Sequence, residues 1–432
     1  MNVYAARRQQ LMDKIGPRAV AIVGGKKLTA RNSDVEHRFR QSSDLWYLTG
    51  FTEPDALCVI APGRAEKFTL FVRPRDPERE TWTGRRAGIE GAKAKFGADQ
   101  SFPIEAAASE LPKLLDGVDE ILYVPGDDAD LDHLVLQTVA HLRQAERRGM
   151  RAPRTISDLR WTLHELRLIK DADALAKMRR AVEVTREAHT AAMRAARDGV
   201  KEYEVEALID YTFRKNGGHA GYGTIVGGGV NATILHYVDN ELPLKGGELL
   251  LIDAGCEIDG FTADVTRTYP IGARFSPAQR RCYELVLAVE KACVGAVKPG
   301  HSIDAIHEQA VELLTRGMMD LGLLRGELRE LIDKAAYKRF YMHRTSHWLG
   351  MDVHDVGIYA PDGKSRPLQA GMVLTVEPGL YIAEDASDVA AEYRGIGIRI
   401  EDDILVTPDG HENLTISIPK EIPDLEKLTA DS

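Results

Sequence analysis

Cysteine is scarce in this sequence, which has only Cys58, Cys256, Cys282 and Cys293 among its 432 residues. None of them belongs to a CxxC pair, so the spacing disfavours both a disulfide framework and a thiolate zinc site. Because free cysteine is among the most buried residue types, we expect buried thiols. The GxSxG signature of many serine hydrolases is absent as well.

Long apolar runs and an excess of positive charge are also missing. No stretch reaches the roughly 18 apolar residues that a membrane-spanning helix needs, and charges are spread through the N-terminal segment. The 56 Lys and Arg residues face 66 Asp and Glu residues, for a formal net charge of −10. The sequence therefore lacks a general field for nucleic acid or anionic lipid. We expect a cytoplasmic protein that binds neither nucleic acid nor membrane.

The length and the 44% hydrophobic content predict two domains. Residues 1–170 contain short β-rich runs such as "AVAIV", "KFTLFVRPR" and "EILYVPG" with helical segments between them, which is typical of an α/β domain. A second domain, residues 171–432, begins with amphipathic helices, and its predicted helices are 171–198, 202–215, 276–296 and 303–321. The final segment, "IPKEIPDLEKLTADS", is expected to be a loosely held end.

Four carboxylates lie within predicted strands of the second domain. "GELLLIDAGCEIDGFTADVTRTYPIG" reads as two strands joined through "EIDG", with Asp253 on the first and Asp264 on the second. "GMVLTVEPGLYI" and "GIGIRIEDDILVT" repeat this plan with Glu377 and Glu401. A carboxylate buried alone in a strand is costly, although each could instead lie in water or pair with an arginine. Four of them in two similar strand pairs favour a shared compensating charge.

The segment "YMHRTSHWLGMDVHD" holds His343, His347 and His354, in a sequence with 13 histidines. Carboxylates with one imidazole form a ligand set that suits Mn²⁺, Co²⁺, Fe²⁺ or Zn²⁺. Two divalent ions would balance four carboxylates and leave a bridging hydroxide as nucleophile. His347 is the best ligand candidate, which leaves His343, His354 and the distant His236 for substrate contact and proton transfer. Taken singly, each is better explained as a hydrogen-bonded structural histidine.

The series "LLIDAG", "FTADVTRTY", "HRTSHWLG", "LTVEPGLY" and "GIRIEDD" resembles the pita-bread metallopeptidases, and most closely the aminopeptidase P family. In the front domain, "RQSSDLWYLTGFTEPDALCVI" and "RPRDPERETWTGRRAG" resemble the creatinase-like N-terminal domain of that family. The resemblance implies an α+β protein: a creatinase/prolidase-like α/β domain followed by a pita-bread catalytic domain, with pseudo-two-fold β-ribbons and helices outside. Methionine aminopeptidases lack the front domain and creatinase lacks the metal ligands, so both are disfavoured.

The same resemblance implies a metal site with five ligands. Asp253 would bind one ion through both oxygens, Asp264 and Glu401 would bridge two ions, and His347 and Glu377 would complete the other. The implied cofactor is two divalent ions, with Mn²⁺ preferred and Co²⁺, Zn²⁺ or Fe²⁺ as alternatives.

Catalytic roles follow from the resemblance as well. Glu377 would act as the base for the bridging water, while His236 and His354 would steady the tetrahedral intermediate and the scissile carbonyl. His343 would lie against the proline side of the bond. One position departs from the family pattern: Arg344 follows His343 where the family usually has glycine, which bears on the shape and charge of the mouth of the site.

Five further residues are implied to support the site. Arg399, Tyr222 and Thr266 would orient the bridging carboxylates. Tyr381 would line the proline pocket, and Trp82 of the front domain would reach the active site of a neighbouring subunit. This last role goes with an expected homo-oligomer, a dimer or a tetramer.

The implied activity is hydrolysis of the N-terminal Xaa-Pro bond of peptides that have proline second. Such a bond is a tertiary amide without an N–H, so it needs a dedicated site. Two alternatives stay open. A prolidase would take only Xaa-Pro dipeptides, although "ERETWTGRR" and "LHYVDNE" favour the aminopeptidase. A catalytically silent binding protein on this fold is the other, but it would have no need of five costly ligands.

Overall fold

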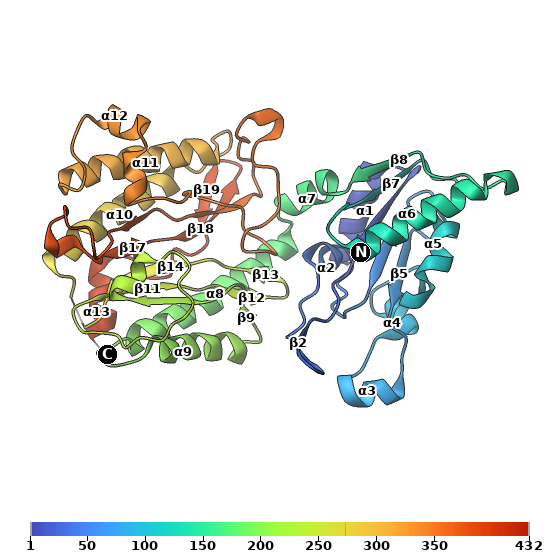
Figure 1. Cartoon of the computed structure of the whole chain (residues 1–432), viewed down its shortest axis with the longest axis horizontal. Coiled ribbons are helices and arrows are strands. Elements are labelled where there is room, and N and C mark those ends of the chain that lie inside the picture. The colour runs from blue at the N-terminus through green and yellow to red at the C-terminus, as the bar shows by residue number, and fades with distance from the viewer. Residues whose placement is uncertain (1, 273, 431–432) are drawn as a thin grey trace. The chain divides into compact units, whose positions relative to one another are not determined.

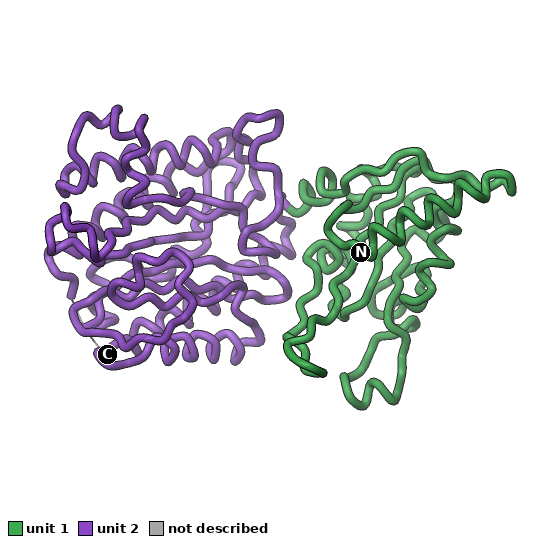
Figure 2. The backbone as a smooth tube through the Cα atoms, viewed as in Figure 1, with its two compact units in different colours: residues 1–167 green, residues 168–432 purple. Residues whose placement is uncertain are grey.

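The computed structural model describes residues 2–272 and 274–430, and the chain divides into two compact units, Met1–Arg167 and Leu168–Ser432 (Figure 2). The division lies three residues before the boundary expected after residue 170. Each unit has its own hydrophobic core. The two units are therefore described separately below.

Unit 1 is built on a six-stranded sheet with the order β6-β5-β4-β1-β7-β8. Its strands are β1 (Ala19–Gly24), β4 (Leu57–Ile60), β5 (Phe68–Val72), β6 (Gln100–Pro103), β7 (Glu120–Tyr123) and β8 (Thr155–Asp158). Strand β1 is buried along almost its whole length, as a central strand covered on both faces requires. The other elements of this unit are α1 (Val3–Ile15), β2 (Ala30–Asn32), β3 (Val35–Glu36), α2 (Ser43–Thr49), α3 (Pro77–Thr83), α4 (Gly88–Ala94), α5 (Ala107–Leu115), α6 (Ala129–Gln144) and α7 (Arg160–Leu168).

In unit 2, long amphipathic helices lie on both sides of a layer of strands (Figure 1). On one side are α8 (Ala172–Ala195) and α9 (Glu202–Lys215), and on the other α10 (Pro277–Ala296) and α11 (Ile303–Asp320). These bounds agree with the expected helices to within three residues. Local signals explain the starts: Asp171 caps α8, and Ser276 and Gln279 form a capping box before α10.

The first β-ribbon of unit 2 is a hairpin whose ladder is interrupted in the middle. Strands β11 (Leu249–Asp253) and β14 (Thr266–Pro270) pair antiparallel, and so do β12 (Cys256–Ile258) and β13 (Phe261–Thr262). Asp259 and Gly260 both have positive φ, 49° and 78°, which is typical of the two-residue turn that suits a twisted hairpin. The expected turn in "EIDG" is thus confirmed.

The second β-ribbon repeats this plan. Strands β15 (Val373–Val376) and β18 (Asp402–Thr407) pair antiparallel, as do β16 (Gly379–Tyr381) and β17 (Gly397–Arg399). The remaining strands, β9 (His219–Ala220), β10 (Ile225–Gly228) and β19 (Gly410–Asn413), extend the two ribbons at their edges. Both ribbons are therefore interrupted at corresponding places, and these interruptions hold the candidate site.

The last part of the chain departs from expectation. Residues 422–430 form helix α13 (Ile422–Ala430), with Ile422, Leu425 and Thr429 buried, and α12 (Leu328–Asp333) is a second short helix of this unit. The segment was expected to be loosely held because chain ends are often poorly ordered, but apolar residues at helical spacing dock its described part against the core.

Two further expectations concern cysteines and membranes. All four cysteines are free and buried, which confirms the prediction of buried thiols. None of the helices in the described ranges combines the length and apolar character needed to cross a membrane.

Candidate metal centre

Four carboxylates lie where the two ribbons are interrupted. Asp253 is the last residue of β11, and Asp264 lies between β13 and β14 rather than on a strand. Glu377 lies between β15 and β16, and Glu401 between β17 and β18. Beside Asp264 the backbones approach so closely that a Cβ at Gly255 would come within 1.8 Å of a carbonyl oxygen. Glycine is therefore needed for the first ribbon to close at this point.

The interruptions bring the predicted ligands together. Asp264, His347 and Glu401 each offer a ligand atom, and these atoms lie within 4.8 Å of one another. His347 Nε2 is 3.3 Å from Asp264 Oδ2 and 3.6 Å from Glu377 Oε1. The side chains of Asp253, Asp264 and Glu401 are buried, and the His347 imidazole and the Glu377 carboxylate are nearly so.

The histidine segment reaches the site because it runs beside β15. The Glu377 N–H donates to the Thr345 carbonyl at 2.8 Å, and the Thr375 N–H donates to the His347 carbonyl at 3.0 Å. His347 is thereby held next to Glu377. Its Nδ1 donates to the Trp348 carbonyl at 3.0 Å, which leaves Nε2 directed at the carboxylates. This is the usual way in which a protein fixes the tautomer of a ligating histidine.

Hydrogen bonds from behind fix the carboxylates. Asp253 accepts from the Tyr222 hydroxyl at 2.6 Å and from Arg399 Nη2 at 2.7 Å. Arg399 Nε donates to Thr266 Oγ1 at 2.9 Å, and the Thr266 hydroxyl donates to Glu401 at 2.6 Å. Thr266 therefore contacts Glu401 directly and Arg399 reaches it through Thr266, whereas the bond from Tyr222 goes to Asp253, which was not expected to bridge the ions.

The negative charge of the buried carboxylates would be balanced by bound cations. Burial, and then the neighbouring acids, raise the pKa values of Asp264 and Glu401 above their ordinary values, and burial raises the pKa of Glu377 to about 7. Burial opposes a charge on His347, but its contacts with Asp264 and Glu377 raise its pKa to about 9. Positive charge placed here would relieve the acids. A set of carboxylate oxygens with one imidazole nitrogen and no thiolate fits divalent ions.

A cavity of about 790 Å³ opens over this cluster, which is within the usual range for ligand sites. Its lining includes the four carboxylates, His347 and Arg399, and also Tyr222, His236, His343, Arg344, His354 and Tyr359. The space is large enough for a short peptide.

The three other histidines surround the cavity in different ways. The His354 ring lies 4.5 Å from the His347 ring, edge to face, and burial together with His347 lowers its pKa. Burial and Arg399 lower the pKa of His343 to about 3, so its ring is neutral. His236 is exposed in the loop that follows β10. Because all three histidines line the same cavity, they can contact one bound peptide.

Two predicted substrate-binding residues are not among those that line the cavity. Tyr381 is 2% exposed and lies behind the wall, where its hydroxyl bonds to His343 Nε2 at 2.8 Å and accepts from Arg399 Nη1 at 3.1 Å. Trp82 is on α3 of unit 1 and is 85% exposed. Their contacts with substrate stay predictions.

Two residues of the site were missed by the sequence reading. Asp403 is fully buried, and its Oδ2 accepts from the Asp264 N–H at 3.2 Å. Thr345 accepts at its carbonyl from Glu377. The run of three acids in "IEDD" was the available signal for Asp403, because alternate residues of a strand share a face and Asp403 lies two positions after Glu401.

Known proteins resemble this chain over nearly its whole length. Residues 176–408 match Metallopeptidase family M24, and residues 4–123 match the aminopeptidase P N-terminal domain. The "Xaa-Pro aminopeptidase" of Escherichia coli (strain K12) is 43% identical, over 98% of this chain and 97% of that protein.

Solved structures agree with these matches. The Pseudomonas aeruginosa aminopeptidase PepP superimposes with a TM-score of 0.97 at 48% identity, covering 99% of this chain and 97% of that one. Proline aminopeptidase P II from Yersinia pestis gives a TM-score of 0.95 at 45% identity, with 100% of both chains covered. The expected fold class, an α/β N-terminal domain followed by a pita-bread domain, is confirmed.

A fold of this kind with such a carboxylate cluster defines a metallopeptidase. The chain belongs to metallopeptidase family M24. Membership implies divalent metal ions, and the buried cluster described above fits them.

Proposed function

We propose that this chain is a metal-dependent aminopeptidase that hydrolyses the bond between the first residue of a peptide and a following proline. The observation that carries the proposal is the cluster of four carboxylates and one imidazole that faces the 790 Å³ cavity. The names of the relatives support the choice of bond, since the Escherichia coli relative is an Xaa-Pro aminopeptidase.

Two divalent ions are the proposed cofactor, held by Asp253, Asp264, His347, Glu377 and Glu401. We propose Mn²⁺, with Co²⁺, Zn²⁺ and Fe²⁺ as alternatives, because this oxygen-rich set with one imidazole accepts all four. Such ions, when bound, polarise a carbonyl group and lower the pKa of water. Two divalent charges would also balance the four carboxylates.

Glu377 is the proposed proton carrier. Its carboxylate lies in the cavity wall, where a group that takes up and releases a proton can reach a bound peptide. Glu377 would take the proton of the attacking water and deliver it toward the proline nitrogen, which cannot leave as an anion. His343, neutral and 3.6 Å from Glu377 Oε2, would lie on the proline side.

His354 and His236 are the proposed donors to the carbonyl oxygen, which gains negative charge as water attacks. Both line the cavity. Donors that are already in place stabilise such a charge more than they stabilise the ground state. Arg399 and Tyr222 act differently, because they hold Asp253 in position and Arg399 reaches Glu401 through Thr266.

The proposal is tested with metal-stripped protein reloaded with Mn²⁺. The substrates are Xaa-Pro-Xaa tripeptides, Xaa-Pro dipeptides and matched Xaa-Ala-Xaa tripeptides. We expect release of the first residue from Xaa-Pro-Xaa and little cleavage of the alanine series. Cleavage of dipeptides alone would indicate a prolidase, and inactivity despite metal binding would indicate a binding protein.

Assembly completes the proposal. Residues 171–432 would carry catalysis, and residues 1–170 would form the creatinase-like domain. Trp82, 85% exposed on α3, would reach the site of a neighbouring copy in a homo-oligomer. Sedimentation of wild-type protein, and kcat of Trp82→Ala, test this part. A cytoplasmic location stays a prediction.

A further inference from the structure

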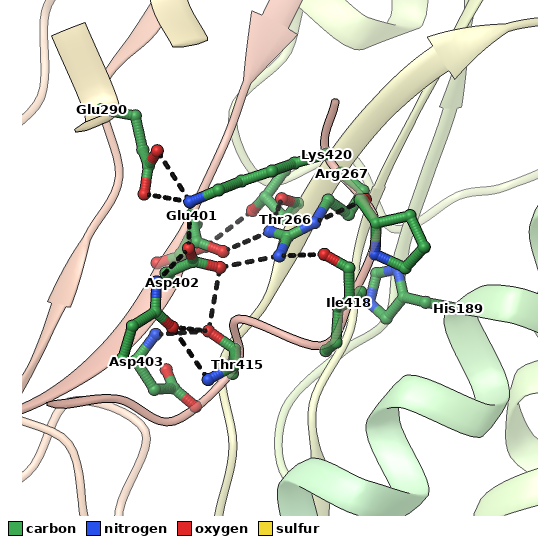
Figure 3. A network of polar contacts seen from close by, with 12 residues as sticks. His189, Thr266, Arg267, Glu290, Glu401, Asp402, Asp403, Thr415, Ile418 and Lys420 are labelled. Carbon is green, nitrogen blue, oxygen red and sulfur yellow. Dashed lines mark hydrogen bonds and ion pairs between the residues drawn. The ribbon is translucent and has the colours of Figure 1, made fainter. Parts of the chain in front are cut away.

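Behind the candidate metal centre lies a second buried set of charges, which we name the Arg267 network: Arg267, Glu290, Asp402 and Lys420 (Figure 3). The side chains of Arg267, Asp402 and Glu290 have no exposed surface, and that of Lys420 is 12% exposed. Lys420 Nζ donates to both oxygens of Glu290, at 2.8 and 2.9 Å, and also contacts Asp402.

Arg267 uses every hydrogen-bond donor that a guanidinium has. Its five N–H groups meet five acceptors at 2.6–3.0 Å, which are the carbonyls of Thr266, Glu401, Ile418 and Pro419 and the Asp402 carboxylate. Lysine offers only three donors, so it cannot reproduce this arrangement.

Two of these acceptors belong to the metal centre itself. Arg267 binds the carbonyl of Glu401 at 2.6 Å and that of Thr266 at 3.0 Å. The Thr266 hydroxyl in turn donates to the Glu401 carboxylate at 2.6 Å. Arg267 therefore fixes the backbone at both ends of the hydrogen bond that orients a proposed metal ligand.

Two more of the acceptors, the carbonyls of Ile418 and Pro419, belong to the segment of residues 413–420. Besides the carbonyls of Ile418 and Pro419, this segment supplies Asn413 Nδ2 and the Thr415 hydroxyl, which donate to Asp402 at 2.6 and 2.8 Å. Because side chains alternate along a strand, Asp402 points away from the face that Glu401 and Asp403 share. Figure 3 shows Asp402 in contact with Arg267, Lys420 and Thr415.

Buried ion pairs are poor devices for stability alone, since apolar residues of similar volume often replace them without loss. Substitution of a residue that orients a metal ligand, by contrast, typically weakens metal binding 10–100-fold. The geometry points to Arg267 as a positioning residue: together with Asp402 and Lys420 it couples the docking of residues 413–420 to the placement of Glu401, and so sets the affinity for divalent metal. The inference rests on the proposed metal site.

The test is Mn²⁺ binding by calorimetry to the metal-stripped full chain. Arg267→Lys keeps the charge but loses at least two donors, and its Kd for Mn²⁺ should rise about 10–100-fold. The matched control is Arg167→Lys in unit 1, where a buried Arg167 donates to Asp44 at 2.7 Å. That variant should have a lower unfolding midpoint and an unchanged Kd.

Thr415→Val is a milder variant in case Arg267→Lys does not fold. It removes the hydrogen bond that the Thr415 hydroxyl donates to Asp402 and the one that it accepts from the Asp403 N–H, and it leaves all the charges in place, so the Kd should rise roughly 2- to 10-fold. Thr415→Ser should restore binding. A lower midpoint with unchanged Mn²⁺ affinity in the folded variants would overturn the inference. If wild-type protein itself does not bind Mn²⁺, that result contradicts the proposed metal site, and the inference about Arg267 is contradicted with it.

Discussion

Glu401 and Asp402 are neighbours in the chain, yet they belong to two buried groups of charges that are balanced in different ways. The Arg267 network holds two cations for its two carboxyl groups. The metal centre holds four carboxylates, and the described residues place a single arginine, Arg399, in an ion pair with them. The first group is completed by the chain itself. The metal centre needs added cations to balance its acids. This need distinguishes a metal-binding site from a structural ion-pair network.

The largest effect on kcat is expected from removing a carboxylate of the metal centre. Glu377→Gln should lower kcat by about 10²–10⁴-fold, since glutamine can neither carry the proton nor bind the metal as well. The measurement is kcat on an Xaa-Pro-Xaa peptide with excess Mn²⁺, and circular dichroism monitors the fold.

A partly buried carboxylate of unit 1 provides the control. Desolvation opposes the charge of Asp44, but Arg167 and His164 lower its pKa to about 2. Asp44→Asn should destabilise the protein and leave kcat unaltered. Near-normal turnover of Glu377→Gln would refute the role proposed for Glu377.

The next effect concerns a group that contributes at the transition state. His354→Ala should lower kcat on the order of 10²-fold, as loss of one donor to a developing oxyanion does elsewhere. The unfolding midpoint should move little because the ring is exposed in the cavity wall. Comparison of kcat with the midpoint checks this, and a lower midpoint with unchanged kcat would make His354 a structural residue.

Removal of metal should give the incomplete cluster a distinctive pH dependence. The pKa of Glu377, ordinarily 4.5, is raised to about 7, so its contribution to metal-free stability is present below pH 4.5 and is lost as the pH rises through 7. That loss is about 3 kcal/mol. The raised pKa of His347 acts in the same direction, with its contribution lost between pH 6.5 and 9.

The difference in unfolding midpoint between Mn²⁺-loaded and metal-free protein should therefore widen from pH 5 to pH 9. Taking the difference cancels the titration of groups remote from the cluster, such as Asp44 in unit 1, which is the same in both samples. A constant difference over this range would show that the cluster does not hold uncompensated acids.

The smallest effect is expected at the mouth of the cavity, where Arg344 pairs with Asp304. Both side chains are about half exposed, so the pair should contribute less than about 1 kcal/mol to stability. Arg344→Gly should lower kcat/KM severalfold for peptides with an acidic residue after the proline, and Asp304→Asn should raise it. Salt should weaken both effects, and identical changes for neutral peptides would contradict them.

The sequence allowed the helices, the hairpin turn and the acidic positions to be predicted, but not the buried ion-pair network behind the metal centre. Helical periodicity placed α8 to α11 within three residues, and the turn in "EIDG" follows from an Asp-Gly pair that tolerates positive φ. Acidic residues within apolar predicted strands indicated which part of the second domain would form a buried acidic cluster. Each of these signals is local.

Arg267 and Lys420 could not be assigned in that way. The alternative in which an arginine pairs with one of the predicted carboxylates holds for Arg399, which contacts Asp253, whereas Arg267 pairs with Asp402. Lys420 lies in a segment that was expected to be loose. Partners separated by more than 100 residues meet only through tertiary packing, and a polar composition does not reveal which side chains become buried.

The lateness of residues 413–420 in the chain has a consequence for biosynthesis. A growing polypeptide emerges from the ribosome with its N-terminal part first, so unit 1 can fold while the rest is still being made. Arg267, however, has no acceptors at Ile418 and Pro419 until those residues have been added. The support that Arg267 gives to the Glu401 carbonyl is therefore completed only after residues 413–420 have been added to the growing chain.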